Sequence, residues 1–161
     1  MTSSEDIVLS MTDLEVHFEK STGFLDFLSE PETVNAVDGV SLDIHENEVI
    51  ALVGESGCGK TTLGKTAIGL QRPTGGSVEY RGQDIWEAND GEGEIEIPHR
   101  DIRRALQIIH QDPGSSLNPN RKVMKILASP LKKWEKHLSQ ADLTARILGM
   151  LERVGMEPPD D

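Results

Sequence analysis

Apolar and polar residues alternate in two stretches near the start of the chain. Every second position is apolar across residues 14–18 and again across residues 40–44. A two-residue period is typical of a strand with one buried face. A glycine and a proline break the pattern in between, so we expect residues 23–32 to form a loop. The N-terminal part of the chain is therefore predicted to be antiparallel β structure, with its first strand over residues 7–18.

A continuous apolar run, residues 49–53, follows this part of the chain. Such a run is typical of a central strand that is buried on both faces of a parallel sheet. Apolar residues then recur at helical spacing, and Pro73 lies just beyond the helix that they predict. These residues are Leu63, Ala67 and Leu70. The order of strand, loop and helix predicts an α/β fold.

The second half of the chain combines short strands, an acidic loop and helices. We predict strands at residues 77–80 and 106–109. Residues 87–96 are acidic and contain glycine, and we expect a mobile surface loop there. In the last part, one short helical face precedes Pro130 and another is ended by Gly155. The two faces consist of Val123, Ile126 and Leu127, and of Leu143, Ile147, Leu148 and Leu151.

The loop after the apolar run has the pattern Gly-x-x-x-x-Gly-Lys-Thr, at Gly54, Gly59, Lys60 and Thr61. Glycines allow the backbone to curl until successive N–H groups face phosphate oxygens, and the N-terminus of the following helix adds partial positive charge. We expect Lys60 to reach the β- and γ-phosphates and the Thr61 hydroxyl to ligate Mg²⁺. The predicted ligand is therefore ATP with Mg²⁺.

The predicted nucleotide-binding set includes the rest of this loop. Thr62 is placed to contact the region of the α-phosphate. Cys58 is the only cysteine of the chain, which excludes a disulfide within it, and at the loop only its backbone needs to contact phosphate. The full set is Gly54, Glu55, Ser56, Gly57, Cys58, Gly59, Lys60, Thr61 and Thr62.

Composition restricts the other functions. The chain has 28 acidic and 16 basic residues, a formal net charge of −12. This balance repels nucleic-acid phosphates and anionic lipid head groups, so we expect no nucleic-acid partner. It fits either a protein from a high-salt cytoplasm or an ordinary acidic protein. No apolar run approaches the roughly 18 residues of a membrane span, and the acidic N-terminus is unlike a secretory signal. These features predict a cytoplasmic location.

Three runs, residues 36–42, 53–62 and 73–78, resemble the nucleotide-binding subunit of ABC transporters. The run at residues 111–119, Gln-Asp-Pro-Gly-Ser-Ser-Leu-Asn-Pro, more narrowly resembles the Q-loop region of oligopeptide and dipeptide importer ATPases. The resemblance implies that the amide oxygen of Gln111 approaches Mg²⁺ and the attacking water. A glutamine carbonyl can do so without adding charge.

The same resemblance implies a fold and a residue that contacts the adenine base. The fold is a P-loop NTPase core with an N-terminal antiparallel β part and the start of a helical subdomain. Within a partial nucleotide-binding domain over residues 1–161, the β part and core occupy residues 7–112 and the helical subdomain residues 113–161. Phe18 aligns with the aromatic residue that stacks on adenine in the family, the alternative being a core phenylalanine of the first strand.

Several motifs of the family have no match after Gln111. They are the signature sequence, the acidic strand with the catalytic glutamate, and the switch histidine. We therefore expect the chain to be an N-terminal portion that lacks the C-terminal half of the usual domain. Alone it would bind Mg-ATP weakly and would not hydrolyse it, so whether this chain is an enzyme stays open. The sheet would be incomplete, with an exposed edge prone to aggregation.

Partners also follow from the resemblance. They would be membrane permease subunits, a second ATP-binding subunit in a homo- or heterodimer and, indirectly, a solute-binding protein. The complete subunit would lie at the inner face of the cell membrane and couple ATP hydrolysis to uptake of peptides or similar small solutes. Two alternatives stay open, a non-catalytic nucleotide-sensing regulatory module and a P-loop kinase.

Overall fold

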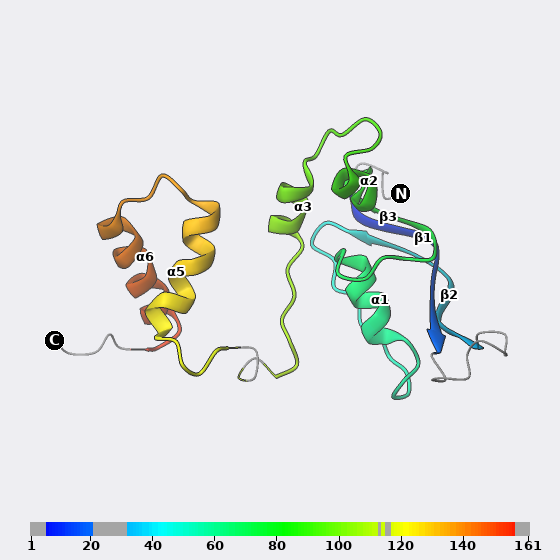
Figure 1. Ribbon diagram of the computed structural model, residues 1–161, viewed down its shortest axis with the longest axis horizontal. Helices are drawn as coiled ribbons and strands as arrows, with labels where there is room; N and C mark the ends of the chain where they lie inside the picture. The colour runs from blue at the N-terminus through cyan, green and yellow to red at the C-terminus, as the bar shows by residue number, and fades with distance from the viewer. Residues whose placement is uncertain (1–5, 21–31, 113, 115–116, 157–161) are drawn as a thin grey trace. The chain divides into compact units, whose positions relative to one another are not determined.

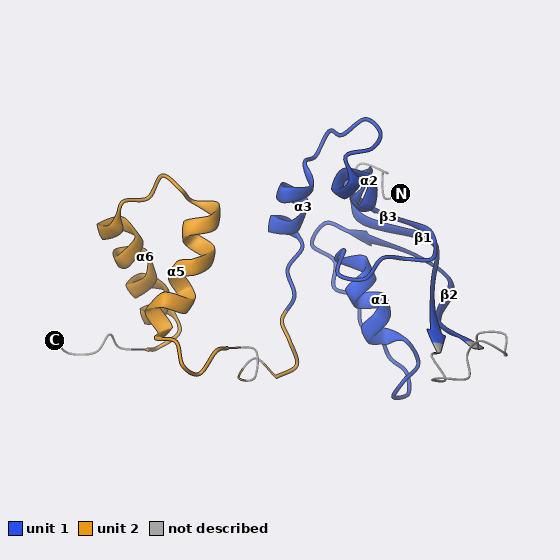
Figure 2. Ribbon diagram, viewed as in Figure 1, with its two compact units in different colours: residues 1–108 blue, residues 109–161 orange. Residues whose placement is uncertain are grey.

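The computed structural model describes residues 6–20, 32–112, 114 and 117–156. The chain divides into two compact units, residues 1–108 and 109–161 (Figure 2). The predicted loop at residues 23–32 lies outside the described residues except for its last position, and the predicted subdomain boundary after residue 112 stays a prediction. No helix among the described residues is long and apolar enough to cross a membrane.

Unit 1 is built on an antiparallel sheet in which the strands lie in the order β2-β1-β3-β4 (Figure 1). The predicted N-terminal antiparallel β part is therefore confirmed, and its second strand is longer than the alternating residues 40–44. The strands are β1 (Ile7–Lys20), β2 (Glu32–His45), β3 (Gly75–Tyr80) and β4 (Gln83–Asp84).

The buried face of β1 changes phase in the middle of the strand. Its buried apolar side chains are Leu9, Met11, Leu14 and Val16. The phase changes at Asp13, where φ is +45° and the pairing with both neighbouring strands shifts register. A β-bulge of this kind inserts one residue and returns the following side chains to the buried face. Phe18, the third position of the predicted alternation, is 41% exposed.

Three short helices complete the core of unit 1. They are α1 (Lys60–Ala67), α2 (Ile85–Asp90) and α3 (His99–Ala105). Their apolar side chains join those of the sheet in one hydrophobic cluster, because each helix turns one apolar stripe inward. The helical members of the cluster are Leu63, Ala67, Ile85, Ala88 and Ile102.

The apolar run before the phosphate loop does not form the predicted strand. Residues 49–53 have no regular secondary structure, and Val49 and Val53 are 94% and 93% exposed. The predicted strand at residues 106–109 is wrong in the same way, and Ile109 is 94% exposed. A strand exists only where a neighbour supplies hydrogen-bond partners. Among the described residues, no strand pairs with either segment.

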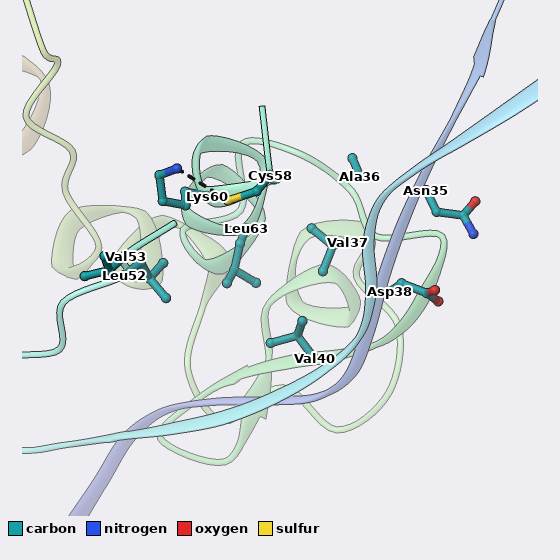
Figure 3. A pocket seen from close by; sticks show the side chains of 11 residues that line it. Asn35, Ala36, Val37, Asp38, Val40, Leu52, Val53, Cys58, Lys60 and Leu63 are labelled. Atoms are coloured by element: carbon teal, nitrogen blue, oxygen red, sulfur yellow. Dashed lines mark hydrogen bonds between the residues drawn. The ribbon is translucent and has the colours of Figure 1, made fainter. Parts of the chain in front are cut away.

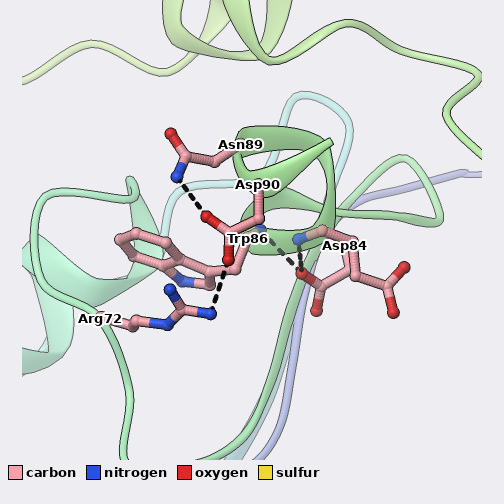
Figure 4. Close-up of polar contacts among 6 residues, drawn as sticks. Arg72, Asp84, Trp86, Asn89 and Asp90 are labelled. Atoms are coloured by element: carbon pink, nitrogen blue, oxygen red, sulfur yellow. Dashed lines mark hydrogen bonds and ion pairs between the residues drawn. The ribbon is translucent and has the colours of Figure 1, made fainter. Parts of the chain in front are cut away.

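Part of the predicted acidic loop is helical. Residues 87–90 belong to α2, which ends at Gly91 with φ at +75°. The Asp84 carboxylate begins the helix by accepting hydrogen bonds from the backbone N–H groups of Trp86, at 2.7 Å, and Glu87, at 3.0 Å (Figure 4). These bonds satisfy donors that have no partner within the helix. The interpretation of residues 87–96 as a loop is therefore correct only after Asp90.

A side-chain cluster ties the turn after α1 to α2. Arg72 lies along the Trp86 ring, 5.5 Å from its centroid, and pairs with the Asp90 carboxylate at 2.7 Å (Figure 4). Asn89 donates a second hydrogen bond to Asp90, also at 2.7 Å. These two hydrogen bonds, that of Asn89 first, hold the pKa of Asp90 below its usual value. The cluster fixes the segment that leaves α1 against the next helix.

Unit 2 contains the helices α5 (Val123–Trp134) and α6 (Gln140–Arg153) (Figure 2). Helix α5 continues through Pro130, beyond the short face predicted for it. Helix α6 begins at a Ser139 hydroxyl that accepts a hydrogen bond from the N–H of Asp142, and it buries Leu143 and Ile147. Gly155, with φ at +74°, follows its last turn as predicted.

Candidate functional site

The glycines of the phosphate loop take backbone conformations that other residues avoid. Gly57 has φ at +84° and Gly59 at +90°, both in the left-handed region. Gly59 also lies against β2, where a Cβ atom in its place would be 2.1 Å from the carbonyl oxygen of Ala36. The loop can therefore turn into α1, beside β2, only with a glycine at this position.

Lys60 folds back over the loop. Its ammonium group donates hydrogen bonds to the carbonyl oxygens of Gly54, at 2.8 Å, and Glu55, at 2.6 Å. It also lies 3.4 Å from the Cys58 sulfur, as Figure 3 shows. It forms no ion pair with any carboxylate of the described residues. The positive charge is thus held at the loop without being neutralised by an acidic side chain.

The N-terminus of α1 lies at the end of the loop. The first backbone bond of the helix runs from the N–H of Leu63 to the carbonyl of Gly59, at 2.8 Å. The N–H groups of Lys60, Thr61 and Thr62 therefore have no acceptor within the helix. In the described part of the chain no side chain caps this end, and the first turn carries no acidic residue. Uncapped N–H groups and the helix dipole together favour an anion here.

A pocket of about 420 Å³ adjoins Lys60. One wall is β2, and the other combines residues 52–53 with the start of α1 (Figure 3). The side chains of Val37 and Val40 point from β2 toward Leu63 (Figure 3). The volume lies in the range of small-molecule sites, which are mostly apolar with a few polar groups. Lys60 supplies a positive charge at the edge of this pocket, which Asp38 of β2 also lines.

Sequence reasoning missed the β2 wall of the pocket. Residues 36–42 entered through the alternation at residues 40–44 and through a resemblance, and none of them received a role in binding. Their alternation predicts a strand but does not show which loop the strand will lie beside. The lining residues from β2 are Asn35, Ala36, Val37, Asp38 and Val40.

Phe18 is not among the residues that line this pocket. It lies near the end of β1, opposite Val34 of β2, and both side chains are partly exposed. The alternative, that Phe18 is a core residue of the first strand, is wrong, because 41% of Phe18 is exposed. Its contact with adenine stays a prediction.

The two predicted magnesium ligands belong to different units. Thr61 is exposed in the first turn of α1, and Gln111 is exposed in unit 2. No group of three His, Cys, Asp or Glu side chains in the described residues could hold a metal ion by itself. Protein sites for nucleotides hold Mg²⁺ through few side chains together with phosphate oxygens and water. Both roles stay predictions.

The remaining residues of the predicted nucleotide-binding set are exposed or half-buried. Glu55, Ser56, Gly57 and Cys58 are exposed, so the loop faces solvent and is open to a ligand. The N–H of Cys58 bonds to the carbonyl of Glu55, at 3.4 Å, which makes a turn within the loop. Thr62 is half-buried, and its carbonyl accepts a hydrogen bond from the buried Thr66 hydroxyl, at 2.9 Å.

The amino-acid sequence matches a known family and several of its members. The family model described as ABC transporter matches residues 37–160. The oligopeptide transport ATP-binding protein OppF of Salmonella typhimurium is 39% identical over 152 residues, which are 94% of this chain and 44% of that protein. The dipeptide transport ATP-binding protein DppF of Escherichia coli is 35% identical over 150 residues, 93% of this chain and 42% of that protein.

Two solved structures show the same fold. The first is cbiO1 from Clostridium perfringens, part of the ABC transporter complex cbiONQ, with a TM-score of 0.64, 22% identity and coverage of 95% of this chain and 52% of that one. The second is a dimeric ATP-binding cassette in a post-hydrolysis state bound to ADP and Pi, with a TM-score of 0.65, 19% identity and coverage of 92% and 58%. They confirm the predicted P-loop NTPase fold class. The chain spans less than half the length of the curated relatives named above.

Proposed function

Because the chain belongs to the ABC transporter family, we propose that its phosphate loop binds ATP together with Mg²⁺. The observation that carries the proposal is the Lys60 ammonium group, held over the loop by two carbonyl oxygens beside the uncapped start of α1. A positive side chain, left-handed glycines and free helical N–H groups meet within a few residues. This combination is what a triphosphate requires.

Each predicted residue then has a role in the proposal. Lys60 contacts the β- and γ-phosphates, Thr61 ligates Mg²⁺ through its hydroxyl, and Thr62 lies near the α-phosphate. Gln111 is the second protein ligand of Mg²⁺, and Phe18 stacks on adenine. Bound ATP supplies the phosphate oxygens that complete the coordination of the ion. The pocket beside Lys60 offers apolar surface for the nucleoside part.

For the whole protein we propose the subunit that drives an importer of oligopeptides or similar solutes. Relatives that are named for oligopeptide and dipeptide transport support the substrate class. In this role the complete protein works with permease subunits and a second ATP-binding subunit at the inner face of the membrane, and indirectly with a solute-binding protein. No observation favours the regulatory module or the P-loop kinase.

Replacement of Lys60 tests the binding proposal. Lys60→Ala removes the only side-chain cation of the loop, so we expect a fluorescent ATP analogue with Mg²⁺ to bind at least about tenfold more weakly, or about 1.4 kcal/mol. Fluorescence titration measures the affinity. The matched control is Lys65→Ala, which removes an exposed lysine from the last turn of the same helix. Equal affinities of the two variants for the analogue would contradict the role of Lys60.

A further inference from the structure

Basic residues are concentrated in one stretch of an otherwise acidic chain. Six of the 16 basic residues lie between positions 121 and 136, where Glu135 is the only acidic residue. The rest of the chain contains ten basic and 27 acidic residues. Most of this basic stretch is helix α5. Unit 2 therefore carries a strongly positive segment that the overall charge of −12 conceals.

The lysines of α5 lie on one side of the helix. At 100° per residue, Lys122, Lys125, Lys132 and Lys133 fall within an arc of about 100°. We call these four residues the lysine face. All four are exposed, and none forms an ion pair with a carboxylate of the described residues. Lys133 lies over the ring of Trp134, 5.0 Å from its centroid.

The opposite side of α5 faces its neighbour in unit 2. Leu127 lines an apolar hollow together with Met150 and Leu151 of α6. By the same helical geometry, Leu127 points away from the middle of the lysine face. The packing of α5 on α6 thus uses the apolar side and leaves the lysine face to solvent.

The one acidic residue of the segment does not neutralise this face. Glu135 is paired with Arg146 of α6, at 2.9 Å, and its side chain is only 13% exposed. Glu135 also lines a hollow of about 410 Å³, together with Lys132, Lys136, Leu138, Gln140 and Leu143. The lysine face therefore ends at this recess, where Lys136 and Gln140 lie beside Lys132.

We propose that the lysine face of α5 binds the surface of a membrane that contains anionic phospholipids. A clustered polybasic segment is attracted to anionic lipid head groups, and the attraction falls off within a Debye length of the surface. The contact is electrostatic, and α5 lies along the membrane surface without inserting, because its apolar side faces α6. The recess beside Lys132 accepts a phosphate head group.

Two observations favour a lipid surface over a nucleic acid. The face consists of lysines, which act as hydrated point charges, whereas specific phosphate recognition by paired hydrogen bonds uses arginine. The 27 acidic residues outside the segment also oppose a flexible polyanion that touches several sides of the protein. A flat surface touches one side only. Binding to DNA is accordingly an outcome that would overturn the proposal.

Vesicle sedimentation tests the proposal with the full chain and without nucleotide, so that the result is separate from ATP binding. We expect the chain to sediment with vesicles of 60% phosphatidylcholine and 40% phosphatidylglycerol in 50 mM KCl, and not with pure phosphatidylcholine. Binding should decline at least tenfold in 500 mM KCl because salt screens the charges. The triple variant Lys125→Gln, Lys132→Gln and Lys133→Gln should bind at least tenfold more weakly.

Two control variants separate the lysine face from net charge and from folding. The variant with Arg100→Gln, Arg103→Gln and Arg104→Gln removes three exposed positive charges from α3 and should bind like the unchanged chain. Replacement of the same three lysines by arginine keeps the charge and should preserve binding even if the glutamine variant fails to fold. Equal losses of vesicle binding in the glutamine variants of α3 and α5 would overturn the proposal, as would loss of binding in a folded arginine variant. So would a failure of the unchanged chain to bind anionic vesicles, or its preferential binding to a DNA duplex.

Discussion

Gly59 lies where the phosphate loop meets β2, and two constraints apply to it. Its φ of +90° is unfavourable for any residue with a side chain, and the backbone of Ala36 occupies the space where a Cβ would lie. The residue that shapes the loop for a phosphate is thus also the residue that lets the loop approach the sheet. The conformation of the site and its packing cannot be changed separately at this position.

Replacement of Gly59 by alanine should therefore affect both stability and binding. We expect Gly59→Ala to lower the free energy of unfolding by about 2 kcal/mol or more, because left-handed backbone and a clash add together. Urea unfolding followed by tryptophan fluorescence measures the change, and titration with an ATP analogue measures the affinity.

Gly64 provides a matched control in the same helix. A Cβ at Gly64 would meet no atom within 4 Å. Gly64→Ala should leave binding unchanged and stabilise the chain by about 0.5–1 kcal/mol, since alanine is the better helix former. Similar destabilisation by the two alanine variants would show that the space around Gly59 is not what matters.

At the residue scale, the loop and the start of the helix that follows it could be predicted from the sequence. Gly54, Gly59, Lys60 and Thr61 are contiguous or nearly so, and their chemistry follows from residue type and spacing. The carbonyl partners of Lys60 could not be predicted, because a flexible side chain can bond to any nearby acceptor. The contribution of Val37 was also hidden, since it depends on a strand that precedes the loop by many residues.

Helix α2 shows how a local signal can outweigh composition. The acidic, glycine-bearing sequence suggested a loop, yet Asp84 and Glu87 stand at the spacing of a capping box, three residues apart. That spacing could have revealed the start of the helix. The structure confirms the role of Asp84, which accepts two backbone hydrogen bonds.

Removal of this cap should cost a measurable part of the stability. Asp84→Ala leaves the N–H groups of Trp86 and Glu87 without their acceptor, so we expect the free energy of unfolding to decrease by about 1 kcal/mol. Urea unfolding is again the measurement. Asp84→Asn keeps an oxygen acceptor at the same place and should lose much less. If both variants lose the same amount, the charge of Asp84 matters and the cap does not.

The strand predictions were right where the pairing strand lies close in sequence, and wrong where no strand of the described residues pairs with the segment. The alternation in β1 and β2 was interpreted correctly, because the two strands pair with each other and lie close in sequence. Residues 49–53 have an equally clear pattern, but a buried strand also needs two neighbours and a cover on each face. The apolar pattern of residues 49–53 therefore indicates a need for burial, but it does not show whether a neighbouring strand is present to pair with them.

At the scale of the whole molecule, two exposed valines lie in an apolar segment that pairs with no strand of the described residues. The chain spans 42–44% of the curated relatives compared above, and Val49 and Val53 are almost fully exposed. Apolar segments without a partner favour association between copies. We expect the isolated chain to self-associate through residues 49–53.

The double variant Val49→Ser with Val53→Ser tests this expectation. It should reduce self-association in analytical ultracentrifugation and change the free energy of unfolding by less than about 0.5 kcal/mol, since neither side chain is buried. Leu14→Ala is the contrast, because Leu14 is 0% exposed and its truncation should cost about 2–5 kcal/mol. Destabilisation of the serine variant to the same extent would mean that residues 49–53 are part of the core.

For the proposed nucleotide site, the way in which Lys60 bonds to its own loop has a consequence for ligand capture. The ammonium group keeps two carbonyl acceptors, from Gly54 and Glu55, before any phosphate arrives. A cation anchored in this manner retains little rotamer freedom, so most of its ordering occurs during folding and little is left for the binding step. The loop therefore presents a receptor of nearly fixed shape, and differences in affinity between nucleotides should arise more from how slowly they leave than from how readily they enter.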